Sequence, residues 1–290
     1  MTATTLYASQ CTLGESPLWH ARKKCFYWVD INAGVLYSLD WQTNTIRNWQ
    51  FDNALSLVVE TVGDDLLLAL GTSVVRFNTD TGSITHLVNV EPDKKNQRCN
   101  DGAVDAKGRL WIGTTQADHD FEGGNLYSIQ ASGNPQIKIE AVTISNGIVW
   151  SLDNKKMYFI DSPTQRVDAF HFNQITGEIV FDRTVITIPI EMGTPDGMTI
   201  DAEGMLWIAH WGGFGVYRWN PFTGKLLDKI EVAAPNVTSC RFAGEHLDQL
   251  VITTARKNMD DSQLEQFPES GNLFIVDTGV KGLDGFRFPG

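Results

Sequence analysis

Three oxygen-bearing side chains stand at corresponding places in the chain and could together hold a metal ion. Glu15 lies in GESPLW, Asn146 in SNGIVW and Asp196 in PDGMTI, each beside a glycine or a serine. Each precedes the last residue of a short apolar run by 14 or 15 positions. Two carboxylates and an amide oxygen suit a hard divalent cation such as Ca²⁺, Mg²⁺ or Mn²⁺. An aspartate before a glycine is usually a turn residue, so the prediction depends on whether the fold brings the three together.

The apolar runs themselves form a repeat. They are FYWVD (26–30), LLLAL (66–70), LWIGT (110–114), MYFID (157–161), LWIAH (206–210) and LVITT (250–254). Their last residues are 40, 44, 47, 49 and 44 positions apart. A period in the forties, with several short strands and Gly, Asp or Asn turns in each period, is typical of propeller blades. The repeat predicts an all-β, six-bladed β-propeller of four-stranded antiparallel blades, as a single domain over residues 1–290. A two-layer sandwich would not explain the even period.

The repeat also predicts where the three polar side chains point. The innermost strand of each propeller blade lines the central channel, so equivalent positions in different blades face one another. We therefore expect the three to converge from the first, fourth and fifth blades. The same register, within a residue or two, holds Asn100, Asp101 and Ser239. Two packed carboxylates without a cation would repel, and one would be driven toward protonation. No cysteine or histidine shares the register, which argues against a structural zinc site.

The composition limits the partners. A net charge of −12 and a pI near 4.9 argue against nucleic acid or an anionic membrane as partner. No apolar run approaches the roughly 18 residues of a membrane span, and the first residues lack the pattern of a secretory signal. The four scattered cysteines are expected to be free thiols, and the interpretation is a cytoplasmic protein. No histidine stands at nucleophile spacing from a serine or cysteine, and His210 is interpreted as a hydrogen-bonded strand residue.

Four ordered motifs carry a resemblance to a known family. They are LGESPLW, NQRCNDGAVDAKGRLWIGT, ISNGIVWSLDNKKMYFIDS and PDGMTIDAEGMLWIAHWGG. With these motifs, nearly the whole chain resembles the gluconolactonase/regucalcin (senescence marker protein) family, and in appearance bacterial sugar-acid lactonases such as xylonolactonase. The resemblance implies a six-bladed propeller with one catalytic divalent metal at the top of its channel.

The resemblance also implies roles for individual residues. The metal ligands are Glu15, Asn146 and Asp196. Asn100 contacts substrate or a metal-bound water, and Arg98 holds substrate oxygens. The family's acidic substrate contact corresponds only weakly to Asp118, because no fixed motif aligns the loop TQADHDFEGGN. Calcium is the first expectation for the metal, with Zn²⁺, Mg²⁺, Mn²⁺ and Fe²⁺ also open.

The predicted reaction is metal-dependent hydrolysis of a small sugar-acid lactone. The metal would polarise the carbonyl, and Asp196 would also act as general base, with one oxygen on the metal and the other free to take a proton. Three alternatives stay open: a non-enzymatic calcium-binding regulator, a phosphotriesterase or lactonase for a non-sugar or anionic-substituted substrate, and a protein-interaction platform. Trp211 and Phe214 are placed near the rim of the pocket, where either shaping it or packing would explain them.

Overall fold

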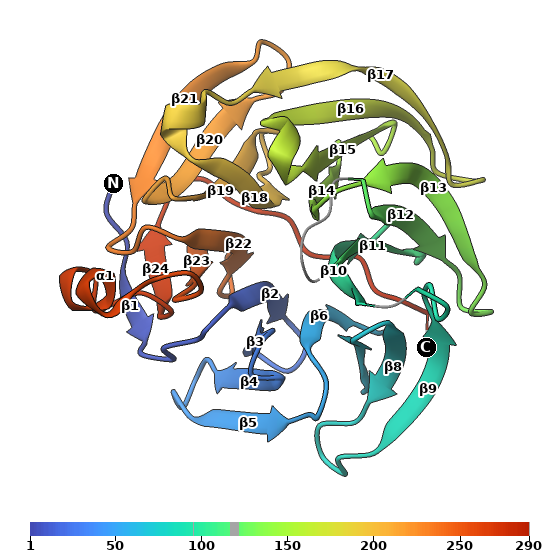
Figure 1. The fold of residues 1–290 in the computed structure, drawn as a ribbon, viewed down its shortest axis with the longest axis horizontal. Coiled ribbons are helices and arrows are strands. Elements are labelled where there is room, and N and C mark those ends of the chain that lie inside the picture. Colours follow the sequence, from blue (N-terminus) through green and yellow to red (C-terminus); the bar gives the residue numbers. More distant parts are fainter. Residues whose placement is uncertain (95, 117–121, 290) are drawn as a thin grey trace.

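The structure is a closed ring of β-sheets. It is a computed structural model that describes residues 1–94, 96–116 and 122–289. Within these residues, six four-stranded antiparallel sheets surround a central channel (Figure 1). The predicted six-bladed β-propeller is confirmed. None of the described helices is long and apolar enough to span a membrane, and all four cysteines are free, as expected.

Each blade runs outward from its innermost strand. Blade 1 contains β2 (Gly14–His20), β3 (Cys25–Asp30), β4 (Val35–Asp40) and β5 (Ile46–Gln50). Blade 2 contains β6 (Leu55–Glu60), β7 (Leu66–Leu70), β8 (Ser73–Phe77) and β9 (Ile84–Asn89). Blade 3 contains β10 (Gln97–Val104), β11 (Leu110–Gln116), β12 (Gly124–Ile129) and β13 (Pro135–Val142). Blade 4 contains β14 (Ser145–Trp150), β15 (Lys156–Asp161), β16 (Arg166–Asn173) and β17 (Glu178–Thr187). Blade 5 contains β18 (Thr194–Ile200), β19 (Leu206–Trp211), β20 (Gly215–Asn220) and β21 (Lys225–Glu231). Blade 6 begins with β22 (Val237–Ala243), β23 (Gln249–Thr254) and β24 (Leu273–Asp277). The six apolar runs of the sequence all lie in the second strands.

The chain ends close the ring. The outermost strand of blade 6 is β1 (Thr4–Tyr7), which pairs antiparallel with β24, so the N-terminal strand completes the blade that the C-terminal strands begin. One short helix, α1 (Asp261–Gln266), follows β23 where the sequence DDSQLEQF indicates helical periodicity. Two single 3₁₀ turns, η1 (Ser162–Thr164) and η2 (Ile190–Met192), precede strands of blades 4 and 5.

Apolar side chains pack between the blades rather than in one central core. Six buried clusters of described residues each join the facing sheets of two neighbouring blades. Trp28, Trp111 and Trp207 are among the largest fully buried side chains. The indole N–H of Trp111 donates to Asp105 at 2.8 Å, and that of Trp207 donates to Asp201 at 2.9 Å. These contacts fix the sheets that position the channel-lining strands.

The C-terminal segment after β24 crosses the channel axis as a strap. Gly282 N donates to Leu247 O at 2.7 Å in blade 6, and Ala202 N of blade 5 donates to Lys281 O at 2.7 Å. Further along, Phe288 N donates to Glu60 O in blade 2 at 2.9 Å. The strap therefore joins blades 5 and 6 to blade 2, and it is visible as the red trace across the ring in Figure 1.

Candidate active site at one mouth of the channel

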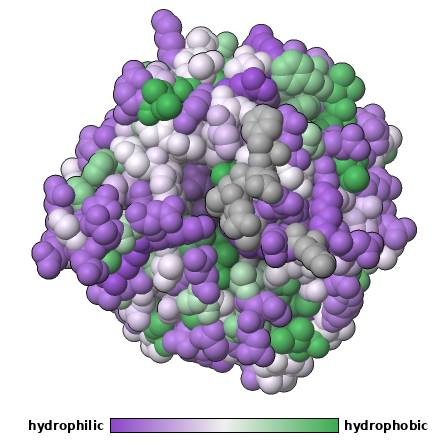
Figure 2. All heavy atoms as spheres, in the orientation of Figure 1, coloured by the Kyte–Doolittle hydropathy of each residue, from purple (hydrophilic) through white to green (hydrophobic). Residues whose placement is uncertain are grey.

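The predicted site residues that the structure describes face one cavity. Glu15 from β2, Asn146 from β14 and Asp196 from β18 line a cavity of about 260 Å³, together with Arg98 and Asn100 from β10. Blades 1, 3, 4 and 5 thus supply the polar groups, and the three oxygen-bearing side chains converge as the repeat predicts. The face shown in Figure 2 is hollowed near the centre of the ring. The weakly aligned Asp118 lies outside the described residues.

An irregularity in each innermost strand aims these side chains into the channel. The pairing of β2 with β3 shifts register between Glu15 and Leu18, and the pairing of β14 with β15 shifts between Asn146 and Ile148. The same shift follows Pro195 in β18, and it recurs in β6, β10 and β22. A bulge bends its strand and turns a side chain out of the alternating pattern. At β2 the bulge includes Ser16 at φ 49°, the left-handed region that non-glycine residues rarely adopt.

Close packing of the strands restricts the residue after two of the three ligand candidates, Asn146 and Asp196. A Cβ on Gly147 would lie 2.6 Å from Met198 Cβ in the next blade. A Cβ on Gly197 would lie 2.2 Å from Ser239 Oγ. Only glycine lets neighbouring inner strands approach this closely. The glycines after Asn146 and Asp196 are therefore explained by the narrow channel.

A chain of hydrogen bonds orients the two asparagine amides. Asn146 Nδ2 donates to Ser162 Oγ at 2.7 Å, which leaves Asn146 Oδ1 directed at the cavity. Asn100 Nδ2 donates to that oxygen at 3.1 Å and to Ser145 O at 2.7 Å. Arg98 Nη1 donates to Asn100 Oδ1 at 2.5 Å and to Cys99 O at 3.0 Å. In this chain the amide nitrogen of Asn146 donates to Ser162, and its amide oxygen accepts from Asn100.

The two carboxylates are buried without a cationic partner. Glu15 is 7% exposed and Asp196 is 8% exposed, and neither forms an ion pair with any described lysine, arginine or histidine within 4.0 Å. Burial, followed by the charge of Asp101, raises the pKa of Glu15 from 4.5 to about 8. Burial, followed by the charges of Glu15 and Asp101, raises the pKa of Asp196 well above its ordinary value. These shifts measure how unfavourable both charges are together without a cation.

The donor set fits a hard divalent cation. Two carboxylates and an amide oxygen face the same cavity, and neither acid forms an ion pair within 4.0 Å, although the charge of Arg98 acts to lower the pKa of both. The described residues include no group of three or more His, Cys, Asp or Glu that could hold a metal, so the amide of Asn146 is needed as the third protein donor. Oxygen donors of this kind match calcium, magnesium and manganese better than a structural zinc site.

Sequence reasoning missed part of the cavity wall. Lys257 and Asn258, in the loop after β23, line the cavity beside Trp211. They stand just after the sixth repeated run, but nothing in that run marks them, because their loop is held by a backbone bond to Thr12 at the other end of the chain. Trp211 shapes the wall as one interpretation proposed, whereas Phe214 packs against Phe267 with ring centroids 5.2 Å apart. Apolar wall residues complete the lining: Leu13, Ile31, Ile144 and Pro195.

His210 is a structural residue, as predicted. It is fully buried, its Nδ1 lies 3.0 Å from Met192 O, and its ring stacks on Tyr217 with centroids 4.0 Å apart. Burial lowers the pKa of His210 to about 4, so the imidazole is neutral at physiological pH.

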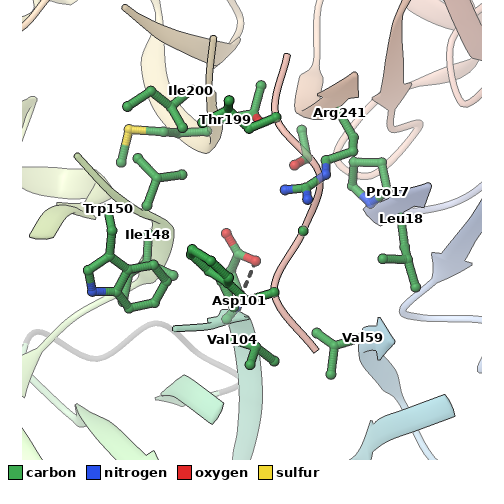
Figure 3. Close-up of a pocket in the computed structure, with 18 of the residues that line it drawn as sticks. Pro17, Leu18, Val59, Asp101, Val104, Ile148, Trp150, Thr199, Ile200 and Arg241 are labelled. Atoms are coloured by element: carbon green, nitrogen blue, oxygen red, sulfur yellow. Dashed lines mark hydrogen bonds between the residues drawn. The ribbon is translucent and has the colours of Figure 1, made fainter. Parts of the chain in front are cut away.

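Two residues that share the register belong to a second cavity further along the channel. Asp101 and Ser239 line a space of about 160 Å³ with Arg241 and apolar side chains of the inner strands. Figure 3 shows Asp101 and Arg241 facing this space from opposite sides, with the C-terminal strap crossing it. Asp101 is close enough to raise the pKa of Glu15 and Asp196 in the candidate active-site cavity. Asp101 does not line the active-site cavity itself.

A six-bladed propeller with oxygen donors converging in its channel defines the class of protein. The match to the family described as SMP-30/Gluconolactonase/LRE-like region covers residues 13–256, and the chain belongs to this family. Regucalcin from Macaca fascicularis is 37% identical over 97% of this chain and 96% of its own length.

Solved structures agree over the whole ring. A luciferin-regenerating enzyme superposes with a TM-score of 0.93 and 31% identity, covering 99% of both chains. A calcium-binding regucalcin from Agrobacterium tumefaciens superposes with a TM-score of 0.94 and 26% identity, covering 99% of this chain and 97% of that one. The family supports a lactonase-type or a calcium-binding role for the chain.

Proposed function

We propose that the protein hydrolyses the lactone of a sugar acid to the open-chain aldonic acid, using one divalent metal ion, with calcium the first candidate. The observation that carries the proposal is the pair of buried, unpaired carboxylates beside an oriented amide oxygen, in a cavity of about 260 Å³ that also exposes Arg98. Glu15, Asn146 and Asp196 would hold the metal. When bound, the metal would polarise the lactone carbonyl and favour the developing negative charge.

The chain's own residues would position the ring and move the proton. Arg98 offers donors that can hold ring or carbonyl oxygens, and Asn100 lies between it and Asn146. Asp196 would take the proton of the attacking water as the water oxygen bonds to the carbonyl carbon. The ring C–O bond then breaks, and the proton goes to the departing ring oxygen. General base catalysis of this kind contributes roughly 10²–10⁴-fold.

The cavity favours an enzyme over a calcium-binding regulator. A regulator needs only the three metal donors, whereas this cavity adds Arg98, Asn100 and Lys257 around an open space next to them. Positioned donors beside a metal site are what a substrate requires. A phosphotriesterase or a lactonase for a non-sugar ring would use the same groups, and a substrate panel separates these reactions.

The test is a lactone panel on metal-stripped and calcium-reconstituted protein. Asp196→Ala and Asn146→Ala should abolish metal-dependent hydrolysis while circular dichroism shows an intact fold. Asp196→Asn should keep calcium binding, measured by calorimetry, and lose turnover. Glu140→Gln, on the outer strand of blade 3, is the matched control and should behave as the wild type. Full lactonase activity in Asp196→Ala, or no calcium binding by the wild type, would contradict the proposal.

A further inference from the structure

Two cationic side chains face the candidate active site. Arg98 comes from β10 in blade 3, and Lys257 comes from the loop after β23 in blade 6. They are close enough for each other's charge to matter: the pKa of Lys257 is lowered, first by burial and then by Arg98, while Asp196 acts in the opposite direction. Two cationic side chains therefore line the same cavity as the carboxylates of Glu15 and Asp196.

The backbone of Lys257 is held firmly in this position. Its N–H donates to Thr12 O at 2.8 Å, and its carbonyl accepts from Asn236 Nδ2 at 3.2 Å. The preceding Arg256 donates from Nε to Ser270 O at 2.9 Å, and the following Asn258 has φ 64°. Because these bonds already order the backbone around Lys257, binding a ligand through its side chain costs little further conformational entropy of the loop.

Neither cation has an acid partner that satisfies it. The Lys257 ammonium makes no hydrogen bond or ion pair with any described residue. Arg98 uses only Nη1 in its hydrogen bonds to described groups, which leaves Nε and Nη2 available. Glu15 and Asp196 form no ion pair with either, and they are the proposed metal ligands. Partly buried donors without partners are costly, and a ligand anion would satisfy them.

We propose that Lys257 and Arg98 form a subsite for an anionic substituent, so that the preferred substrate is a sugar-acid lactone bearing a second acidic group, a carboxylate or a phosphate. This inference rests on the proposed lactonase function and specifies its substrate class. A hydroxyl group would need one donor, whereas two adjacent cations with several free donors match the several acceptor oxygens of an anion.

The charge of the whole protein strengthens the argument. The chain carries a net charge of −12, so its overall field repels an anionic substrate. Within the cavity, two cations balance the two acids, and a bound divalent metal would leave the site positive.

The experiment compares three lactones on the calcium-loaded protein: glucono-1,5-lactone, a glucaric acid monolactone and 6-phosphogluconolactone. The variants are Lys257→Met, Lys257→Arg and, as the control, Lys225→Met on the outer strand of blade 5. Lys257→Met should lower the ratio of kcat/KM for the anionic lactones to that for the neutral one by about 10- to 100-fold, the range for a hydrogen bond to a charged group. Lys257→Arg should restore most of the ratio, and Lys225→Met should leave it unchanged.

A binding measurement makes the test independent of turnover. Calorimetric titration of glucarate should show tighter binding than gluconate to the wild type, and Lys257→Met should remove that difference. An unchanged ratio in Lys257→Met, together with equal affinities for the two acids, would overturn the subsite. If no lactone is hydrolysed by any protein, the proposed function fails, and the titration still decides the subsite. Whichever anionic lactone has the higher kcat/KM identifies the substituent as carboxylate or phosphate.

Discussion

The metal-free protein should lose stability as the pH rises, and Glu15→Gln should remove much of that loss. In the folded chain, burial and the charge of Asp101 raise the pKa of Glu15 from 4.5 to about 8. In the unfolded chain the carboxyl ionises at its ordinary value. Between these two values the folded state therefore holds about one more proton than the unfolded state, and stability falls with increasing pH. The stability that this extra proton gives the folded state is fully present below about pH 4.5 and is lost as the pH rises through about 8.

The magnitude follows from the size of the shift. One proton of difference changes the free energy of unfolding by about 1.4 kcal/mol per pH unit. From about pH 5.5 to about pH 7.5, Glu15 alone should cost the metal-free protein about 2.5 kcal/mol. The raised pKa of Asp196 has the same sign and adds to the slope. Glutamine keeps the shape of the side chain and never ionises, so Glu15→Gln should be the more stable protein at the higher pH.

Urea unfolding in the presence of a chelator measures this difference at several pH values. Glu140→Gln, which removes an exposed glutamate, is the control and should follow the wild type. Added calcium should stabilise the wild type more at about pH 7.5 than at about pH 5.5, because the ligands must lose their protons to bind. It should stabilise Glu15→Gln less than the wild type, because the amide oxygen can still bind calcium but one ligand charge is lost. Parallel pH curves for the wild type and Glu15→Gln without metal would refute the reasoning.

Three further variants test how the fold supports the site. Asp201→Asn should lower the free energy of unfolding by about 1–3 kcal/mol in urea, because the buried Asp201 carboxylate accepts from Trp207 and Arg218 and an amide serves these donors less well, while Arg218 keeps Glu203 as a charge partner. Gly147→Ala should lower the melting temperature and the calcium affinity, since its Cβ would lie 2.6 Å from Met198 Cβ. Gly63→Ala, whose nearest neighbour would be 3.8 Å away, is its control. Arg287→Met should cost only about 1 kcal/mol in thermal unfolding, because the buried glutamate it contacts at 2.8 Å keeps a second arginine.

The repeat made both the fold and the centre of the site predictable from the sequence. The second strand of each blade contains a similar apolar run. The number of runs therefore predicts the number of blades, and their spacing predicts the register of the inner strands. Glu15, Asn146 and Asp196 share that register, and the structure places all three in one cavity. Their roles as metal ligands stay predictions.

Features that do not repeat could not be predicted in this way. Lys257 reaches the cavity because its loop is tied to Thr12, at the other end of the chain. Ser162, which orients the amide of Asn146, lies in a 3₁₀ turn that, among the described residues, only blade 4 has at this place. The strap over the channel is held by backbone contacts to three blades, and backbone contacts carry no residue signature. Each of these depends on long-range pairing that the local pattern does not contain.

The bulges explain how a symmetric ring can hold an asymmetric site. All six inner strands shift register near their start, so the scaffold presents six equivalent positions to the channel. Blade 2 fills its position with the apolar stretch that begins at Leu55, whereas blades 1, 4 and 5 supply oxygen donors. Blade 3 adds Arg98, and blade 6 adds Lys257 from a loop rather than from its inner strand. Arg98 is hydrogen-bonded through Asn100 to Asn146, so a change there would also disturb a proposed metal ligand. Lys257 has no such bond to Glu15, Asn146 or Asp196 among the described contacts, so a change at this one place can alter the ligand that fits the cavity while the proposed metal site stays intact.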